Sequence, residues 1–454
     1  MELVVDAQSG EVLHEVNRIL EFVDGNVSGM ATESSGADVC EEETAAGLPY
    51  AKVTMGSTSV FADVNGDYSI TGSGDLTSRL DGKFFNVNHL QGGDSSLMQN
   101  SIDPNFLHNE ANSDEFYRAE VNAYLQANVV RDFTLSYAPN YPTIANQLSF
   151  TVEVNDSSVC NAFYFGDFIR FFNAGSGCSN TAFSVIVHHE YGHHLVATAG
   201  SGQGQYGEGM GDVMGVLITG DNELGRGFLS SDCVQGIRDA NNNVQYPCSG
   251  GIHDCGQLIS GCVWDTLEAM EASFGNEAVD IVSSLAVNSI LMHAGDTISP
   301  SITMDWLVLD DDDGDLENGT PHCAEIQAGF AEHGMEVSGM ECPEVNPLLT
   351  IDYPEGKPSL IDPYGGTWVA VNFLSGTTEP APDSGNLHIS VHGGAWEEIP
   401  LVPATESDYV AVFPYLECGE IVDWYISVDT VDGDVVESPN NAPDNSWNAH
   451  VFSG

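Results

Sequence analysis

Residues 184–200 read SVIVHHEYGHHLVATAG, and this stretch decides how the middle of the chain folds. A run of valine and isoleucine leads into the motif without a break, which predicts a long buried helix from about residue 181 to 199. Within that helix His189 and His193 stand four residues apart, so both imidazoles project from one face. Two such rings can bind one tetrahedral cation. Glu190 lies between them, close enough to polarise a water on that cation without binding it.

A second helix, predicted from about residue 207 to 219, supplies the remaining donors. The segment GEGMGDVMG places Glu208 and Asp212 one helical turn apart. Three ligands, the two motif histidines and Glu208, with one open position are the arrangement of a catalytic zinc. Asp212 is placed to accept the free ring N–H of a ligating histidine and to fix its tautomer. The sequence therefore predicts a zinc site with His189, His193 and Glu208 as ligands.

The charge of the chain excludes several classes of partner. Lys and Arg total 10 against 68 Asp and Glu, a formal net charge of −58 over 454 residues. Such a surface repels phosphate backbones and anionic lipid, so nucleic-acid and membrane-surface functions are excluded. Because no apolar run approaches the ~20 residues of a membrane span, we expect no membrane insertion. We expect a monomer.

The ten cysteines favour disulfides and an oxidising compartment. Several lie in loop-like stretches at short separations, notably Cys160 and Cys178, Cys233 and Cys248, and Cys323 and Cys342. No signal peptide is visible in the chain, and we expect a secreted, extracellular protein.

Four blocks follow one another along the chain. Residues 1–22 contain a strand-turn-strand fragment, and short β-runs with turn signals over 23–97 predict a small β-sandwich. Strands followed by helices predict an α+β domain over 98–343, whose first helix follows a capping box of Asn112 and Glu115. Alternating strands over 344–454 predict a β-sandwich of immunoglobulin or fibronectin type III character.

The H-E-x-x-H motif followed by E-x-x-x-D resembles the gluzincin zinc metalloproteases, particularly the thermolysin-like and fungalysin-like families. Asn161 and Ala162, in NAFY, are similar to the family's edge strand, which implies that they pair with the backbone of a peptide substrate. His253, in GGIHDCGQ, is similar to the histidine that stabilises the oxyanion. The resemblance implies a zincin metalloprotease domain of α+β class flanked by two all-β sandwich domains.

The flanking segments resemble known families more weakly. VVDAQSGEVL is similar to the end of a propeptide domain, and FADVNGDYSI is similar to a carboxypeptidase-regulatory-like sandwich. Two departures are visible near the metal motif. The interval of 14 residues between His193 and Glu208 is shorter than the family's, so the glycine-rich loop must reverse the chain tightly. The family's tyrosine beside the oxyanion has Tyr206 as its nearest candidate.

A final candidate site is the acidic run that surrounds Gly314. A solvated loop and a calcium site are both consistent with it, because calcium binds clustered carboxylates. The candidate calcium ligands are Asp310, Asp312, Asp313 and Asp315.

The expected function is that of a secreted zinc endopeptidase, hydrolysing protein or peptide substrates with Glu190 as the base. Two alternatives stay open. An exopeptidase can use the same zinc site if an acidic group binds the free α-amine, and the sequence shows no secure candidate. An adhesion or matrix-binding protein can retain a zincin scaffold without catalysis.

Overall fold

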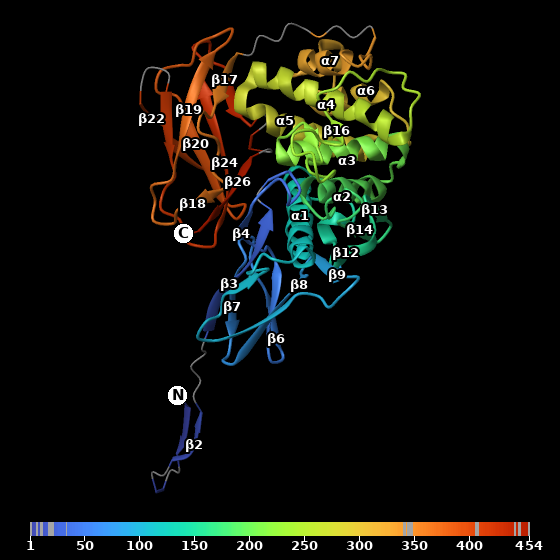
Figure 1. Cartoon of the computed structure of the whole chain (residues 1–454). Coiled ribbons are helices and arrows are strands. Elements are labelled where there is room, and N and C mark those ends of the chain that lie inside the picture. Colours follow the sequence, from blue (N-terminus) through green and yellow to red (C-terminus); the bar gives the residue numbers. More distant parts are fainter. Residues whose placement is uncertain are drawn as a thin grey trace. The chain divides into compact units, whose positions relative to one another are not determined.

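Figure 1 shows the computed structural model of the chain. It describes residues 2–5, 8–9, 12–16, 22–32, 34–338, 342, 348–404, 408–439, 442–443 and 446–452. Two compact units are formed, the first by Met1–Trp264, Ser284–Asp305 and Phe330–Glu336 and the second by Asp265–Ser283, Trp306–Gly329 and Val337–Gly454. Mixed helices and many β-sheets confirm the predicted multidomain protein with α+β and β-sandwich character.

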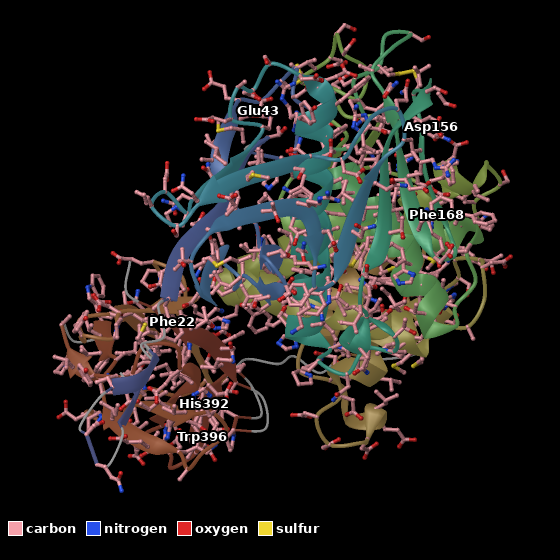
Figure 2. The ribbon with its side chains drawn as sticks, turned by 90° about the horizontal axis from the view of Figure 1, so that it is seen from below. Phe22, Glu43, Asp156, Phe168, His392 and Trp396 are labelled. Atoms are coloured by element: carbon pink, nitrogen blue, oxygen red, sulfur yellow. A yellow bond between two sulfur atoms is a disulfide. The ribbon has the colours of Figure 1, made fainter. Side chains whose placement is uncertain are left out.

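An eight-stranded sheet runs through the first unit in the order β13-β14-β12-β9-β8-β5-β6, with β10 beside β8. Figure 2 shows Phe168 of β14 at the outer margin of this unit. The strands are β5 (Ala51–Met55), β6 (Thr58–Phe61), β8 (Asp75–Gly82), β9 (Phe85–His89), β10 (Ser96–Asn100), β12 (Phe150–Val159), β13 (Ala162–Phe165) and β14 (Phe168–Asn173).

This sheet crosses residue 97, where the sequence suggests that a small sandwich ends. Strand β9 pairs in parallel with β12, and the buried residues Val87 and Val152 lie opposite each other. The strands before residue 97 therefore do not form a separate sandwich, because their sheet continues from β9 into β12, β14 and β13. Pairing between strands so far apart in sequence leaves no local signal, which is why the sequence pattern suggests two domains.

A second sheet of the first unit has the order β11-β3-β4, with β7 also beside β3. The predicted strand-turn-strand fragment is present as an antiparallel pair, β1 with β2. Gly10 of its turn and all of residues 17–21 lie outside the described residues. The strands are β1 (Glu2–Val5), β2 (Val12–Val16), β3 (Phe22–Thr32), β4 (Glu43–Gly47), β7 (Asp67–Thr71) and β11 (Phe106–His108).

The two helices that carry the metal motif lie close to their predicted ranges of about 181–199 and 207–219, and two other helices differ from expectation. Helix α1 begins at Glu115 and is capped by Asp114, whose carboxylate accepts from the Phe116 N–H, so Asn112 is not the cap. Helix α6 was not predicted, because its sequence runs directly into the acidic loop. The helices are α1 (Glu115–Tyr137), α2 (Ser184–Ala199), α3 (Gly204–Thr219), α4 (Ile252–Phe274), α5 (Ala278–Met292), α6 (Ser301–Asp310) and α7 (Cys323–Ala331), with 3-10 turns η1 (Ile144–Asn146), η2 (Gly275–Glu277) and η3 (Leu316–Asn318).

The C-terminal part of the second unit is a two-sheet sandwich with one apolar core. One sheet has the order β17-β19-β23-β22 and the other β18-β26-β24-β20-β21, with β25 beside β24. Trp424 and Phe413 meet edge to face in the core. The strands are β17 (Leu349–Asp352), β18 (Leu360–Ile361), β19 (Trp368–Ser375), β20 (Asn386–Val391), β21 (Glu397–Pro400), β22 (Val402–Pro403), β23 (Asp408–Val412), β24 (Ile421–Asp429), β25 (Val435–Ser438) and β26 (Trp447–Val451).

Disulfides are present, as predicted. They join Cys40 to Cys233, Cys160 to Cys178, Cys248 to Cys255, and Cys323 to Cys342. Two of these join cysteines at the short separations noted in the sequence, whereas Cys233 and Cys248 bond to other partners. Among the described residues, no helix is both long and apolar enough to span a bilayer.

Candidate metal centre

Helices α2 and α3 lie antiparallel and side by side, joined by residues 200–203. Gly200 ends α2 in the left-handed region at φ 89°, and its N–H bonds back to the Ala197 carbonyl. Gly204 opens α3, also with a positive φ. Because glycine adopts these angles without steric cost, the short interval between His193 and Glu208 closes as the loop composition predicts.

Glycines four residues apart let the two helices approach closely. A Cβ added at Gly207 would lie 3.3 Å from His193 Nδ1, and one added at Gly211 would lie 2.7 Å from His189 Nδ1. One turn further, a Cβ at Gly215 would lie 2.6 Å from Val185 Cγ2. The imidazoles therefore rest on α3 backbone, and the glycine stripe Gly207, Gly211 and Gly215 sets the distance between the helices.

The ε nitrogens of the two histidines converge on the Glu208 carboxylate. His189 Nε2 lies 3.4 Å from Oε2, and His193 Nε2 lies 3.7 Å from Oε1. Donor atoms of the three side chains lie within 4.8 Å of one another. The structure thus brings together the three residues that the sequence predicts as metal ligands.

The δ nitrogens of both rings have acceptors of their own. His189 Nδ1 lies 2.8 Å from Asp212 Oδ1, and His193 Nδ1 lies 2.7 Å from Gln203 Oε1. In the neutral ring an acceptor at Nδ1 fixes the proton there, which makes Nε2 the nitrogen available to a cation. Asp212 therefore lies where the sequence predicts it, next to a ligand candidate.

These donors fit a zinc ion. Tetrahedral ligands at ~2.0–2.2 Å from zinc are separated from one another by about 3.4 Å, close to the distances between the histidine nitrogens and Glu208. Glu208 Oε2 is buried and has only long contacts, at 3.4 Å to His189 Nε2 and 3.3 Å to His253 Nε2, neither of which meets hydrogen-bond geometry, so a cation would satisfy it better. Two imidazoles and one carboxylate are also the donor set of known catalytic zinc sites.

The charges around the ligands hold them in place. Burial alone raises the pKa of Glu208, but hydrogen bonding from His189 and the nearby imidazoles outweigh it and lower that pKa. Burial alone lowers the pKa of His189, yet Asp212 and Glu208 outweigh it and raise that pKa to about 10. Without a cation both ring nitrogens of His189 therefore carry protons, and a metal ion would displace the proton on Nε2. The Glu208 carboxylate is thus kept ionised, as a metal ligand must be.

Glu190 lies in the same buried environment with a different electrostatic balance. Burial, aided by the negative charge of Glu208, raises the pKa of Glu190 to about 7. The backbone of Tyr164 lies near this carboxylate and opposes part of that rise. A carboxyl group with a pKa near neutrality is suited to take up and release a proton in one catalytic cycle.

The predicted substrate-binding residues lie at an open sheet edge beside the ligands. Ala162 is the first residue of β13, which pairs antiparallel with β14 and ends the eight-stranded sheet. Asn161 precedes it and is exposed. Tyr164 of the same strand stacks parallel to the His193 ring, with centroids 6.5 Å apart. One edge of β13 therefore faces away from the sheet next to the metal ligands.

His253 also lies at the ligand cluster, in the first turn of α4. Its Nε2 is 3.3 Å from Glu208 Oε2, and its side chain is 62% exposed. The Cys248–Cys255 disulfide encloses this turn and fixes the residues on either side of His253. The imidazole therefore borders the open side of the cluster.

Tyr206, the tyrosine suggested beside the oxyanion, and two histidines that flank the metal motif lie outside the ligand cluster. Tyr206 is fully buried and stacks on His293 with centroids 3.9 Å apart, so the suggestion that it borders the oxyanion is wrong. The reason is helical geometry, because a residue two positions before Glu208 lies on the opposite side of α3. His188 bonds to Gln126 and His194 lies 3.3 Å from the Tyr164 hydroxyl, so both have structural roles.

The candidate calcium ligands do not come together as a set. Asp310 ends helix α6, is buried, and accepts from the Thr320 hydroxyl and the His322 N–H. Its other oxygen lies 2.5 Å from His322 Nδ1, so Asp310 is not a ligand candidate. Asp313 and Asp315 accept from nearby backbone N–H groups as turn residues. The carboxylates that do cluster are Asp311, Asp312 and Asp313.

Two residues of the cluster were missed by the sequence analysis. Arg238 of β16 (Arg238–Asp239), which pairs with β15 (Glu223–Leu224), donates to Asp212 Oδ1 over 2.7 Å from Nη2. Gln203 accepts from His193 Nδ1 and donates to the His193 carbonyl. A signal for Arg238 existed, because a chain with so few cations is expected to use each buried one to pair a buried carboxylate.

Comparisons with known proteins do not name a family. The sequence matches no protein family and no curated protein. Parts of the chain are similar in structure to CopC from Methylosinus trichosporium OB3b, with 16% identity over 23% of this chain and 92% of that one, TM-score 0.17. Others are a Br derivative of BhCBM56, 14% identical over 23% and 92%, TM-score 0.15, and a Cellulomonas fimi endo-β-1,4-mannanase double mutant, 11% identical over 40% and 45%, TM-score 0.16. Scores this low carry no inference about fold or function.

Proposed function

We propose that the chain is a secreted zinc endopeptidase whose metal is held by His189, His193 and Glu208. The observation that carries the proposal is the convergence of two ε nitrogens and one carboxylate beside the buried Glu190. The side chain of His253, largely exposed, borders this cluster and supports an open fourth position. The disulfides are compatible with an extracellular site of action.

Bound zinc would supply Lewis-acid polarisation of the scissile carbonyl and of the attacking water. Glu190 takes a proton from that water and passes it to the leaving amine nitrogen. Asp212 and Gln203 keep the two imidazoles in the tautomer that directs Nε2 at the cation.

Substrate placement falls to two further elements of the first unit. The open edge of β13 offers backbone N–H and C=O groups that an extended peptide can pair with, at Asn161 and Ala162. Such pairing fixes the peptide relative to the cluster, which lowers the entropic part of the barrier. His253 is placed to donate a hydrogen bond to the oxyanion that develops on the carbonyl oxygen.

The test compares the wild type with Glu190→Gln in casein and quenched-peptide hydrolysis, with zinc content measured in both. Glu190→Gln keeps the side-chain shape but removes the base, so we expect bound zinc and a rate lower by several orders of magnitude. Glu271→Gln, an exposed glutamate, is the matched control and should retain full activity.

Each outcome decides between the proposals. Zinc-loaded wild type without hydrolysis would overturn the peptidase assignment and favour the scaffold alternative. Equal activity in Glu190→Gln would overturn the mechanism. Cleavage of peptides with a free α-amine but not of N-acetylated ones would replace the endopeptidase with the exopeptidase alternative.

A further inference from the structure

The outer face of the β17-β19-β23-β22 sheet is partly apolar. Alternate residues of β19 point into the core, as shown by the buried Val369 and Val371, so their neighbours point outward. On the outward face Trp368 is paired across the strands with Val412, and these side chains are 51% and 40% exposed. Val402 of the edge strand β22, 52% exposed, lies opposite Val410 and continues the same surface.

Two exposed tyrosines lie in the segments that continue beyond the end of these strands. The chains on either side of the Trp368–Val412 pair continue together, since the Phe413 N–H bonds to the Thr367 carbonyl and the Leu416 N–H to the Pro363 carbonyl. This pairing brings the segments of Tyr364 and Tyr415 next to each other. Their side chains are 77% and 69% exposed. The aromatic surface is defined as Tyr364, Trp368 and Tyr415.

Charge narrows the kind of partner that fits this surface. In the sequence from residue 348 to 454, Lys357 is the one Lys or Arg, against seventeen Asp and Glu. Lys357 is already engaged, with its ammonium 2.7 Å from Asp280. An anionic polymer or lipid would be repelled, and a second copy of the chain would bring like charges together. A cationic partner would bind through ion pairs that salt weakens, so an uncharged partner is distinguished from it by binding that salt leaves unchanged.

We propose that the aromatic surface binds a neutral polysaccharide. The C–H faces of pyranose rings are apolar and flat, so they pack on exposed aromatic side chains, which combine large contact area with few rotatable bonds. The carboxylates of Asp362 and Glu417, next to the aromatic surface in sequence, are acceptor-only groups that suit sugar hydroxyls. This function is separate from the proposed peptidase activity and does not depend on the metal ligands.

The experiment measures depletion of the full chain from solution by insoluble cellulose, chitin and β-1,3-glucan, each at low and high salt. We expect at least one of the three to bind it, with an affinity that salt does not weaken, because no ion pairs form. The triple variant Tyr364→Ala/Trp368→Ala/Tyr415→Ala should bind roughly a hundredfold more weakly, since each anchor ring contributes about tenfold or less.

Trp396→Ala is the matched control, because it removes an indole beside the other sheet of the same sandwich (Figure 2). It should bind like the wild type, and circular dichroism of both variants verifies the fold. Absence of binding to all three glycans, or unchanged binding by the triple variant, would overturn the proposal. Preferential binding to dextran sulfate, or self-association that Trp368→Ala abolishes, would also overturn it in favour of another occupant.

Discussion

Replacing Gly211 by alanine tests whether the glycine stripe positions the metal ligands. The new methyl group would lie 2.7 Å from His189 Nδ1 and 2.9 Å from Cε1, against ~3.5 Å for an unstrained contact. The imidazole must therefore shift by about 0.7 Å or more. A shift of that size lengthens the 2.8 Å contact between His189 Nδ1 and Asp212 beyond a normal hydrogen bond.

The expected effect is a loss of zinc affinity with little loss of fold. Disturbing a partner that orients a metal ligand costs roughly 10–100-fold in metal affinity. Alanine in a helix interior is favoured over glycine by about 1 kcal/mol, which offsets part of the steric strain. Competition with a chelator of known affinity measures the zinc Kd, and thermal unfolding of the metal-free protein measures the fold.

Gly215→Ala is the matched control, because its methyl group would lie 2.6 Å from Val185 Cγ2 instead of an imidazole. It adds the same atom to the same stripe of α3, one turn away, so it should reduce stability without weakening zinc binding. If Gly211→Ala binds zinc as tightly as the wild type, the imidazole does not depend on α3 backbone and the reasoning is refuted.

Three further predictions concern the surroundings of the site and the buried charges. Arg238→Met removes the guanidinium that pairs with Asp212, so the free energy of unfolding should fall by about 3–5 kcal/mol. The affinity for zinc should fall as well. An unchanged denaturation midpoint would contradict this prediction. Burial raises the pKa of Glu120 from 4.5 to about 7, so the folded state holds a proton that the unfolded state has lost between these values. The free energy of unfolding should therefore fall as pH rises from about 4.5 to 7, by on the order of 3 kcal/mol more in the wild type than in Glu120→Gln. Equal pH slopes of the two proteins in urea titrations would refute this prediction. Cys248→Ser opens the loop around His253, with an entropic loss of about 2.5 kcal/mol; kcat per bound zinc should also fall, and an unaltered kcat would show that the disulfide does not position His253.

The sequence predicts those residues of the candidate site that repeat at the spacing of one helical turn. His189 and His193 repeat at one helical turn, as do Glu208 and Asp212, so their shared faces follow from helix geometry alone. Arg238 does not, because it approaches Asp212 from a two-residue strand whose position depends on the whole first unit. No spacing rule links residues that meet only through tertiary structure.

The acidic run shows the same limit from the other direction. The composition of the run favours a solvated loop or a cation site. Asp310 is instead the last residue of helix α6, and its carboxylate is buried where it accepts hydrogen bonds from Thr320 and His322. The hydrogen bonds that the Thr320 hydroxyl and the His322 N–H donate to the Asp310 carboxylate outweigh the tendency of clustered charges to remain in water. Tertiary contacts from residues ten or more positions away cannot be inferred from the composition of the run.

The parallel pairing of β9 with β12 determines how this chain can be divided. The sequence alone suggests cutting the chain after residue 97. A fragment that starts there lacks β9, so the backbone groups of β12 that pair with β9 become exposed along an apolar strand. Such an edge pairs with other copies, so the fragment should aggregate rather than fold. A fragment that carries helices α2 and α3 should therefore fold only if it begins before β5 and so includes the whole shared sheet. Insertions near the N-terminus should be tolerated only outside the strands of that sheet.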